Sequence, residues 1–354
     1  MGKNIKLNNK QARNVRARHS QLLEENQTDA SINETSLSPI TNGTVLSRYG
    51  KQADVEDDTT HIVYRCFMRR TIDSITTGDK VLFRIDEQHG DGHTGLVETI
   101  KPRTSLLSRP DFYDGLKPIV ANVSRILIVS AKEPEFSTNI LDRYLIACEQ
   151  AKITPIIIIN KSDLFDVNEL EDIQKTLKVY ENIGYKTLIV NTKNKQGMEE
   201  LLQLISKETT VLVGQSGVGK SSLLNTLMPQ AEAETNIISL NSKLGQHTTT
   251  NTKLYHLPQG GIIIDSPGVR EFALWHLTTE EVTQSYKEFS PFLGTCKFRD
   301  CNHLTDPGCA IIQALKNGDI AEFRYNNYHR IIVSMTQNIP NAYAKLGKNT
   351  GNKK

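Results

Sequence analysis

The apolar residues of this chain follow two different patterns, one after the other. From Gly43 to Ile100, short runs of β-branched and aromatic residues alternate with Gly, Asp and Thr turns, which is typical of closely spaced strands. From Asn122 onward, continuously apolar runs such as Ile156–Ile159 alternate with stretches whose apolar residues recur every three or four positions. Buried parallel strands that alternate with amphipathic helices give this second pattern. The sequence therefore predicts a small β-barrel followed by an α/β domain.

The two ends of the chain show neither pattern. Residues 1–38 are polar, without a sustained apolar period, so we expect a disordered extension. Residues 341–354 form a second, short tail. Both ends are basic although the formal net charge is only +2. Such tails are either solvated termini or arms that contact the phosphates of a nucleic acid, and the sequence leaves both interpretations open.

Length and composition narrow the class of protein. A chain of 354 residues is too long for one ordinary core and predicts two or three domains. No stretch reaches the roughly 20 apolar residues of a membrane helix, and residues 1–20 lack the apolar centre of a secretory signal. We therefore expect a cytoplasmic protein with no membrane partner. The barrel is expected to be of the OB type, which binds oligonucleotides in many proteins and serves as a plain interaction module in others.

A phosphate-binding loop is predicted after the apolar strand at Thr210–Val213. The sequence there has the spacing Gly-x4-Gly-Lys-Ser between a strand and a helix, which is the P-loop pattern. Its glycines let successive backbone N–H groups surround a phosphate, and the helix N-terminus adds partial positive charge. In this pattern Lys220 contacts the β- and γ-phosphates, and Ser221 offers its hydroxyl to Mg²⁺. The predicted nucleotide contacts are Gly214, Gln215, Ser216, Gly217, Val218, Gly219, Lys220, Ser221 and Ser222.

A second nucleotide element, Asn160-Lys161-Ser162-Asp163, follows the strand at Pro155–Ile159. This is the edge of an open α/β sheet where ligands bind. A carboxylate accepts both N–H donors on the Watson–Crick edge of guanine, so Asp163 is expected to select GTP over ATP. Asn160 would contact the base or brace the loop, and the stem of Lys161 would lie against the ring. The loop Asn191-Thr192-Lys193 is a candidate for a backbone donor to the guanine oxygen.

The third nucleotide element is the apolar strand that ends in Asp265-Ser266-Pro267-Gly268. In the Asp-x-x-Gly pattern, Asp265 holds the Mg²⁺ sphere and the Gly268 amide meets the γ-phosphate. The preceding segment, residues 245–250, is predicted to be a switch in which one threonine closes over Mg²⁺. We take Thr249 as the candidate for this threonine, although the pattern does not single out one of the three. His247 either orients the attacking water or has a purely structural role. The candidate catalytic residues are thus Lys220, Ser221, Asp265, Gly268, His247 and Thr249.

Slow intrinsic turnover is expected from the residue that follows this element. Many GTPases carry a glutamine there that positions the attacking water, whereas this chain has Val269. An apolar side chain cannot orient water by hydrogen bonds. Because the switch lies just before the C-terminal region, we expect the nucleotide state to be passed along residues 270–277.

A metal site is predicted near the C-terminal end, where three of the five cysteines lie close together. Three cysteines and a histidine form a complete set of the ligands that zinc prefers, which argues for one structural ion. The alternative is three buried thiols beside a chance histidine. The surrounding turn is polar, which is unlike the surroundings of core cysteines. The predicted ligands are Cys296, Cys301, His303 and Cys309. Two helices follow, on which we expect Arg324, His329 and Arg330 to face outward, either as solvated residues or toward RNA.

The order of the nucleotide elements is unusual. In ordinary small GTPases the phosphate loop precedes the Asn-Lys-x-Asp element, but here residues 160–163 precede residues 214–221. Together with the barrel and the Cys/His cluster, this permuted order resembles the RsgA family of ribosome-assembly GTPases, also called YjeQ or YloQ, over roughly residues 40–335. The resemblance implies a multidomain fold: an OB-type barrel at 39–104, a circularly permuted α/β GTPase (G) domain at 105–275 and a zinc-binding helical domain at 276–340.

The resemblance also implies an activity and partners. A member of that family would hydrolyse GTP to GDP with Mg²⁺, bind the small (30S) ribosomal subunit and its rRNA late in maturation, and leave after hydrolysis. Hydrolysis would be slow alone and faster on the subunit. Other assembly factors are further expected partners, and the expected state is a monomer. Two alternatives stay open: a permuted GTPase that acts on another RNA or assembly, and a GTP-binding RNA scaffold without significant turnover.

Overall fold

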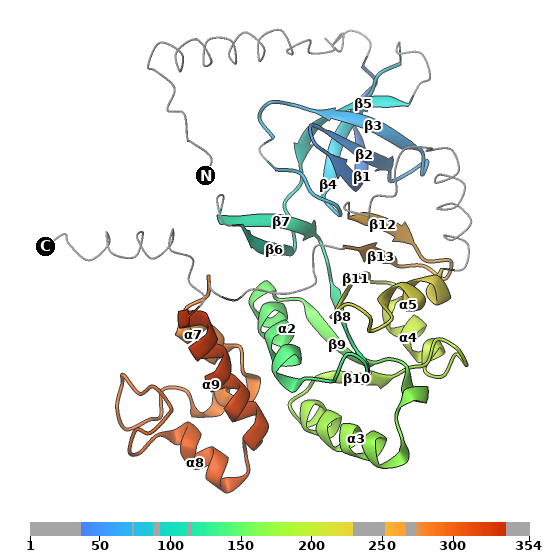
Figure 1. Ribbon diagram of the computed structural model, residues 1–354. Coiled ribbons are helices and arrows are strands. Elements are labelled where there is room, and N and C mark those ends of the chain that lie inside the picture. Colours follow the sequence, from blue (N-terminus) through green and yellow to red (C-terminus); the bar gives the residue numbers. More distant parts are fainter. Residues whose placement is uncertain are drawn as a thin grey trace, which may run out of the picture.

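The computed structural model describes residues 37–72, 74–87, 93–111, 115–228, 252–266, 274 and 276–337 (Figure 1). Three units follow one another: a barrel, an α/β domain and a helical unit. The predicted extension at 1–38, apart from its last two residues, and the tail at 341–354 lie outside the described residues. No helix in the described part is both long and apolar enough to cross a membrane.

The first unit is a closed five-stranded barrel with the strand order β1-β2-β3-β5-β4. β3 and β5 pair in parallel, and the other neighbours are antiparallel. Alternate side chains point inward because strand residues alternate between the two faces, and Val45, Val55 and Phe83 are fully buried there. The predicted OB-type barrel is confirmed. Its strands are β1 (Thr41–Tyr49), β2 (Gln52–Asp57), β3 (Val63–Met68), β4 (Lys80–Ile85) and β5 (Thr94–Ile100).

The second unit contains a six-stranded sheet with the order β10-β9-β8-β11-β13-β12. All neighbours are parallel except the edge strand β12, which is antiparallel to β13. The strands are β8 (Arg125–Ser130), β9 (Thr154–Ile159), β10 (Lys186–Ile189), β11 (Thr209–Val213), β12 (Lys253–His256) and β13 (Ile262–Asp265). A hairpin of β6 (Leu106–Asp111) and β7 (Gly115–Ala121), which the apolar pattern did not predict, connects the barrel to β8.

Helices cover both faces of this sheet. Ile157 and Ile159 of β9 pack in one core cluster with α2 and α3, whereas Ile156 and Ile158 pack in another with α4 and α5. Both faces of β9 are therefore buried, which explains its continuously apolar sequence. The helices are α2 (Thr138–Ala151), the short 3-10 helix η2 (Ser162–Leu164), α3 (Val167–Asn182), α4 (Met198–Ile205) and α5 (Lys220–Leu227).

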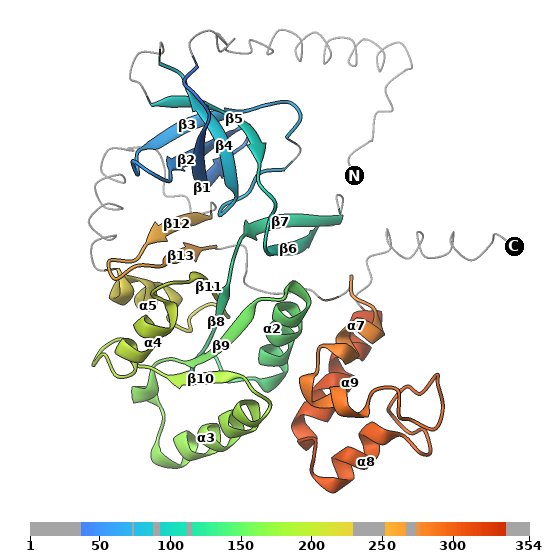
Figure 2. The same ribbon diagram turned by 180° about the vertical axis from the view of Figure 1, so that it is seen from behind.

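The third unit packs against the α/β domain through α9, which lies beside α2 in both views (Figures 1 and 2). Its apolar residues belong to the same core cluster as those of α2, so the two units share one core. Arg324 of α9 corrects our expectation that it faces outward, because the residue is only 1% exposed. Arg330 is exposed as expected. The elements are α7 (Thr279–Gln284), the 3-10 helix η3 (Lys287–Phe292), α8 (Ala310–Asn317) and α9 (Glu322–Gln337).

Candidate nucleotide and metal sites

Glycine is required at two points of the loop between β11 and α5. Gly214 has φ +142° and Gly219 has φ +93°, which are conformations that side chains rarely adopt. A Cβ atom on Gly214 would lie 2.2 Å from the carbonyl oxygen of Val129, and one on Gly219 would lie 2.4 Å from Nδ2 of Asn160. The loop therefore runs unusually close to β8 and to the Asn-Lys-x-Asp element.

Lys220 lies across this loop. Its Nζ donates to the carbonyl oxygens of Gly214, at 2.8 Å, and of Gln215, at 2.7 Å. Ser221 and Ser222 follow it in the first turn of α5 and are exposed. An ammonium group, a helix N-terminus and exposed hydroxyls are thus gathered at one loop, an arrangement that suits a phosphate.

The two predicted nucleotide motifs touch each other. Asn160 Nδ2 donates to the carbonyl oxygen of Val218 at 3.0 Å, and Lys161 Nζ donates to that of Gly217 at 2.6 Å. Asn160 is fully buried, and its Oδ1 has no hydrogen-bond partner among the described residues. A buried polar atom without a partner is costly, so this oxygen is suited to a donor from a ligand. The reversed order of the motifs in the sequence does not keep them apart in space.

The carboxylate of Asp163 is held from two sides. Its Oδ1 accepts from Asn191 Nδ2 at 3.1 Å, and its Oδ2 accepts from Lys193 Nζ at 2.6 Å. The hydrogen bond from Lys193 is the main reason why the pKa of Asp163 lies below its ordinary value. Asp163 is thus kept ionised, as an acceptor for two N–H donors must be. A cavity of about 300 Å³ opens beside Asp163 and Asn191.

Asp265 stands at the end of β13, the strand next to β11. Burial raises the pKa of Asp265, and the charge of Lys220 opposes that rise. The neighbouring Ser266 hydroxyl is 3.1 Å from that of Thr252. Three predicted participants, Gly268, His247 and Thr249, lie outside the described residues, as do residues 270–273 and 275 of the expected signal path.

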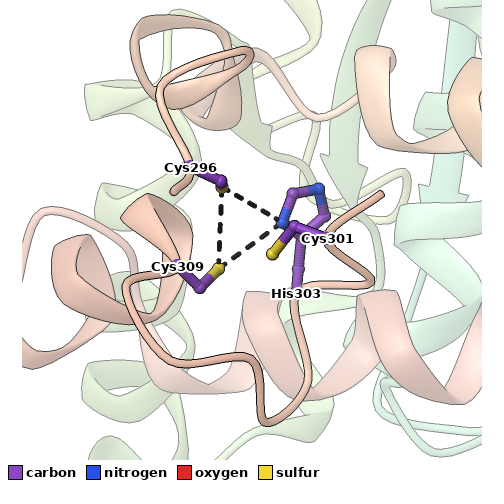
Figure 3. Close-up of side chains that lie close together, drawn as sticks. All are labelled: Cys296, Cys301, His303 and Cys309. Carbon is purple, nitrogen blue, oxygen red and sulfur yellow. Dashed lines mark hydrogen bonds between the residues drawn. The ribbon is translucent and has the colours of Figure 1, made fainter. Parts of the chain in front are cut away.

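The four predicted metal ligands converge on one point (Figure 3). Their ligand atoms all lie within 4.8 Å of one another. The sulfurs of Cys296 and Cys309 are 3.9 Å apart, and His303 Nδ1 is 3.7 Å and 3.5 Å from them. Zn–S distances of about 2.3 Å and Zn–N distances of about 2.0 Å in a tetrahedron give separations of about 3.5–3.8 Å. The separations among Cys296, His303 and Cys309 fit a tetrahedral ion of this size, with Cys301 as the fourth ligand of the group.

The comparisons with known proteins match this arrangement. A family model described as RsgA GTPase matches residues 100–275, a span that contains both nucleotide motifs. The small ribosomal subunit biogenesis GTPase RsgA of Haemophilus influenzae (strain PittEE) is 48% identical over 333 residues, which cover 94% of this chain and 96% of that relative. The chain belongs to the RsgA GTPase family. RsgA proteins are GTPases, so the activity predicted from the motifs is confirmed at this level, and a guanine nucleotide with Mg²⁺ is implied.

Other RsgA relatives extend the likeness over the whole molecule. RsgA 1 of Vibrio vulnificus (strain YJ016) is 49% identical over 341 residues, covering 96% of this chain and 97% of the relative. The crystal structure of YjeQ from Thermotoga maritima has a TM-score of 0.69 at 30% identity and covers 84% of this chain and 99% of that one. YloQ, described as a circularly permuted GTPase, has a TM-score of 0.66 at 30% identity, and the match covers 85% of this chain and 97% of that one.

Sequence reasoning missed two side chains at the guanine end of this RsgA site. The sequence predicts only a backbone donor from the loop at 191–193, yet the side chains of Asn191 and Lys193 hold Asp163. A local signal was present, because an amide and a cation follow the end of β10, the strand beside β9. Their direction could not be predicted, since it depends on the turn that brings residue 191 back toward residue 163.

Proposed function

We propose that this chain hydrolyses GTP to GDP and phosphate in the course of small ribosomal subunit biogenesis, the process for which its RsgA relatives are named. The observation that carries the nucleotide part is the contact between the two motifs, through Asn160 with Val218 and Lys161 with Gly217. This contact supports a single site in which Asp163 reads guanine and residues 214–222 bind the phosphates. The reaction is expected in the cytoplasm, where ribosomal subunits mature.

Each site residue has a role in this proposal. Asp163 accepts the N–H donors of guanine, Asn160 and Lys161 join the base loop to the phosphate loop, and residues 214–222 surround the phosphates. Lys220 would compensate charge on the β- and γ-phosphates, and Ser221 and Asp265 would hold Mg²⁺. When bound, Mg²⁺ neutralises charge on the phosphate oxygens. Gly268, His247 and Thr249 complete the site as the switch residues.

We assign the domains as residues 39–104, 105–275 and 276–340, with basic segments at 1–38 and 341–354. A single structural zinc ion would be held by the Cys296, Cys301, His303 and Cys309 group, which its spacing supports. The set is complete without water, so the ion would fix the turn before α8 and take no part in hydrolysis. The protein is expected to act as a monomer on the 30S subunit and its rRNA, with other assembly factors present.

The rate is proposed to depend on the subunit. Val269 cannot orient water, so the chain alone would turn over slowly, and contact with the subunit would order the switch residues. The test is a steady-state GTPase assay with and without purified small subunits. Stimulation by subunits is the expected result, and fast turnover that subunits do not change would contradict it.

A matched variant separates an enzyme from a scaffold that only binds GTP. Lys220→Ala is expected to lower the hydrolysis rate by about 10²-fold or more, because a positioned charge donor at the phosphates is lost. Lys207→Ala, an exposed lysine before β11, should leave the rate unchanged. Single-turnover cleavage at the same negligible rate in the unaltered protein and in Lys220→Ala would favour the scaffold.

A further inference from the structure

The guanine end of the site contains a cation that the proposed chemistry does not use. Asp163 accepts from two side chains, but they differ in their surroundings. Asn191 is 2% exposed, and its Oδ1 also accepts from the backbone N–H of Lys193 at 2.8 Å and of Asn194 at 3.4 Å. It is therefore fixed inside the loop and braces Asp163 from within the protein.

Lys193 approaches Asp163 from the solvent. Its side chain is 75% exposed, against 30% for that of Asp163, and the Nζ to Oδ2 distance is 2.6 Å. A base that binds between the two motifs must also arrive from the solvent side, because Asn191 closes the inner side. The two N–H donors of guanine use both oxygens of this carboxylate. Each oxygen can accept a second hydrogen bond, so Asn191 can share Oδ1 from the inner side, whereas Lys193 lies on the solvent side of Oδ2, where the base must approach. The ammonium group and the base thus compete for this approach.

We propose that Lys193 is a competing internal ligand of Asp163, and that it weakens the binding of GTP and GDP by the same factor. The inference rests on the proposed role of Asp163 as the guanine reader. Guanine gains two charge-assisted hydrogen bonds only after Lys193 has left the carboxylate. The loop thereby limits the affinity for both nucleotides, which favours release of GDP after hydrolysis. An exposed ion pair is weak, so the expected factor is about two- to fivefold.

The test measures dissociation constants for GDP and for a non-hydrolysable GTP analogue by calorimetry. Lys193→Met, which keeps the length of the side chain, should bind both nucleotides about two- to fivefold more tightly. Lys193→Arg keeps a cation near Asp163 and should stay close to the unaltered protein. Lys195→Met removes a charge from an exposed position in the same loop and is the matched control, expected to show no change. Equal or weaker binding by Lys193→Met overturns the proposal.

Salt gives an independent readout. Salt weakens phosphate binding in every variant, but that effect cancels when the unaltered protein is compared with Lys193→Met. The affinity ratio of the two should fall toward one at about 0.5 M salt, because an exposed ion pair is screened. A ratio that salt does not change would mean that the methionine acts by packing against the base, which contradicts the proposal.

A double variant separates failure of this inference from failure of the proposed function. Asp163→Asn should weaken GDP binding and favour xanthosine diphosphate, whose ring carries a carbonyl where guanine carries its amine. In that background, Lys193→Met should not change the affinity for xanthosine diphosphate, because the ion pair no longer exists. If Asp163→Asn leaves GDP binding intact, the guanine-reading role itself is wrong. If Asp163→Asn has the expected effect but Lys193→Met does not change nucleotide affinity, Asp163 reads guanine and Lys193 does not compete with it.

Discussion

The barrel and the helical unit at residues 276–337, called the zinc unit here after its proposed ion, attach to the G domain through joints of different character. At the barrel joint, Glu56 of β2 meets His256 of β12 at 2.7 Å, with side chains 9% and 49% exposed. Thr77 adds a hydrogen bond of 3.3 Å to the carbonyl oxygen of Thr252. At the zinc joint, the side chains of Arg324 and Asp142 are 2% and 0% exposed. The barrel joint is held by separate hydrogen bonds, some of them buried, such as that from Thr76 to the carbonyl oxygen of Ile119, whereas the zinc joint contains a buried ionic network.

The zinc joint holds its charges in a complete network. Arg324 donates two hydrogen bonds to Glu288, at 2.6 Å and 3.1 Å, and a further one to Asp142. Asp142 also accepts from Tyr180 and from Asn327, both at 2.7 Å. The network joins α2, α3, η3 and α9. Because buried charges are tolerated only when they are fully paired, this joint cannot loosen by small steps.

The difference indicates where the molecule can move. A buried ionic network is either intact or broken, so the zinc unit and α2 should move together as one rigid body. At the barrel joint, the pair of Glu56 and His256 can exchange its hydrogen bond for water at smaller cost, because the His256 side chain is half exposed. The barrel joint also connects to the Asp-x-x-Gly element, because Thr252 contacts Ser266, the residue after Asp265. Changes in barrel position are therefore expected to accompany the nucleotide cycle more readily than changes in the zinc unit.

The largest expected effect comes from breaking the buried network. Arg324→Met should lower the free energy of unfolding by about 3–5 kcal/mol, because Asp142 and Glu288 remain buried without their cation. Urea denaturation measures this loss. Arg330→Met, on the same helix but exposed, is the control and should change stability little. Equal stability of the two variants would mean that the zinc joint is no firmer than the barrel joint.

Metal removal is expected to have a smaller and local effect. Zinc-finger peptides that depend wholly on their metal gain about 10–16 kcal/mol from it, but here α9 is also fixed by Arg324. Chelation should therefore expose the amides of residues 296–309 to hydrogen exchange, while α2 and α9 keep their protection. Mass spectrometry of the exchanged protein resolves the two regions. Loss of protection in α2 along with the turn would show that the joint itself needs the metal.

The smallest effect is expected at the barrel joint. Glu56→Gln should lower the free energy of unfolding by at most about 1.5 kcal/mol, since a partly exposed hydrogen bond is replaced by a weaker one. Glu87→Gln, at an exposed barrel position, is the control. The variant should also widen the distance distribution between spin labels on the barrel and on α3 without changing that between α9 and α3. A stability loss comparable to that of Arg324→Met would remove the contrast between the joints.

Much of this architecture follows from local sequence patterns, and the exceptions share one cause. The barrel, the parallel sheet and the helices were predicted because their apolar periods are visible within short windows. β2 carries a weak strand signal because most of its residues are acidic, polar or alanine, which are uncommon in strands, and β12 because its four residues include only two apolar ones, Leu254 and Tyr255.

Arg324 was assigned to the wrong side of its helix for a related reason. A charged residue in a helix is expected to face water unless its partners are known, and here they lie far off in the sequence. Asp142 is 182 positions away and Glu288 is 36. Motifs such as residues 214–222 carry their chemistry in adjacent residues, so they could be recognised. The side-chain direction of Lys193 depends on a partner 30 positions away and could not be predicted.

The position of β11 in the sheet has a mechanical consequence. It lies between β8, where the chain enters from the barrel hairpin, and β13, the last strand before the zinc unit. The three strands run in parallel, so the part of a pulling force between the barrel and the zinc unit that does not pass through α2 is expected to act as shear along both sides of the strand that carries the phosphate loop. A large particle that binds both the barrel and the zinc unit would strain the nucleotide pocket without contacting the pocket itself.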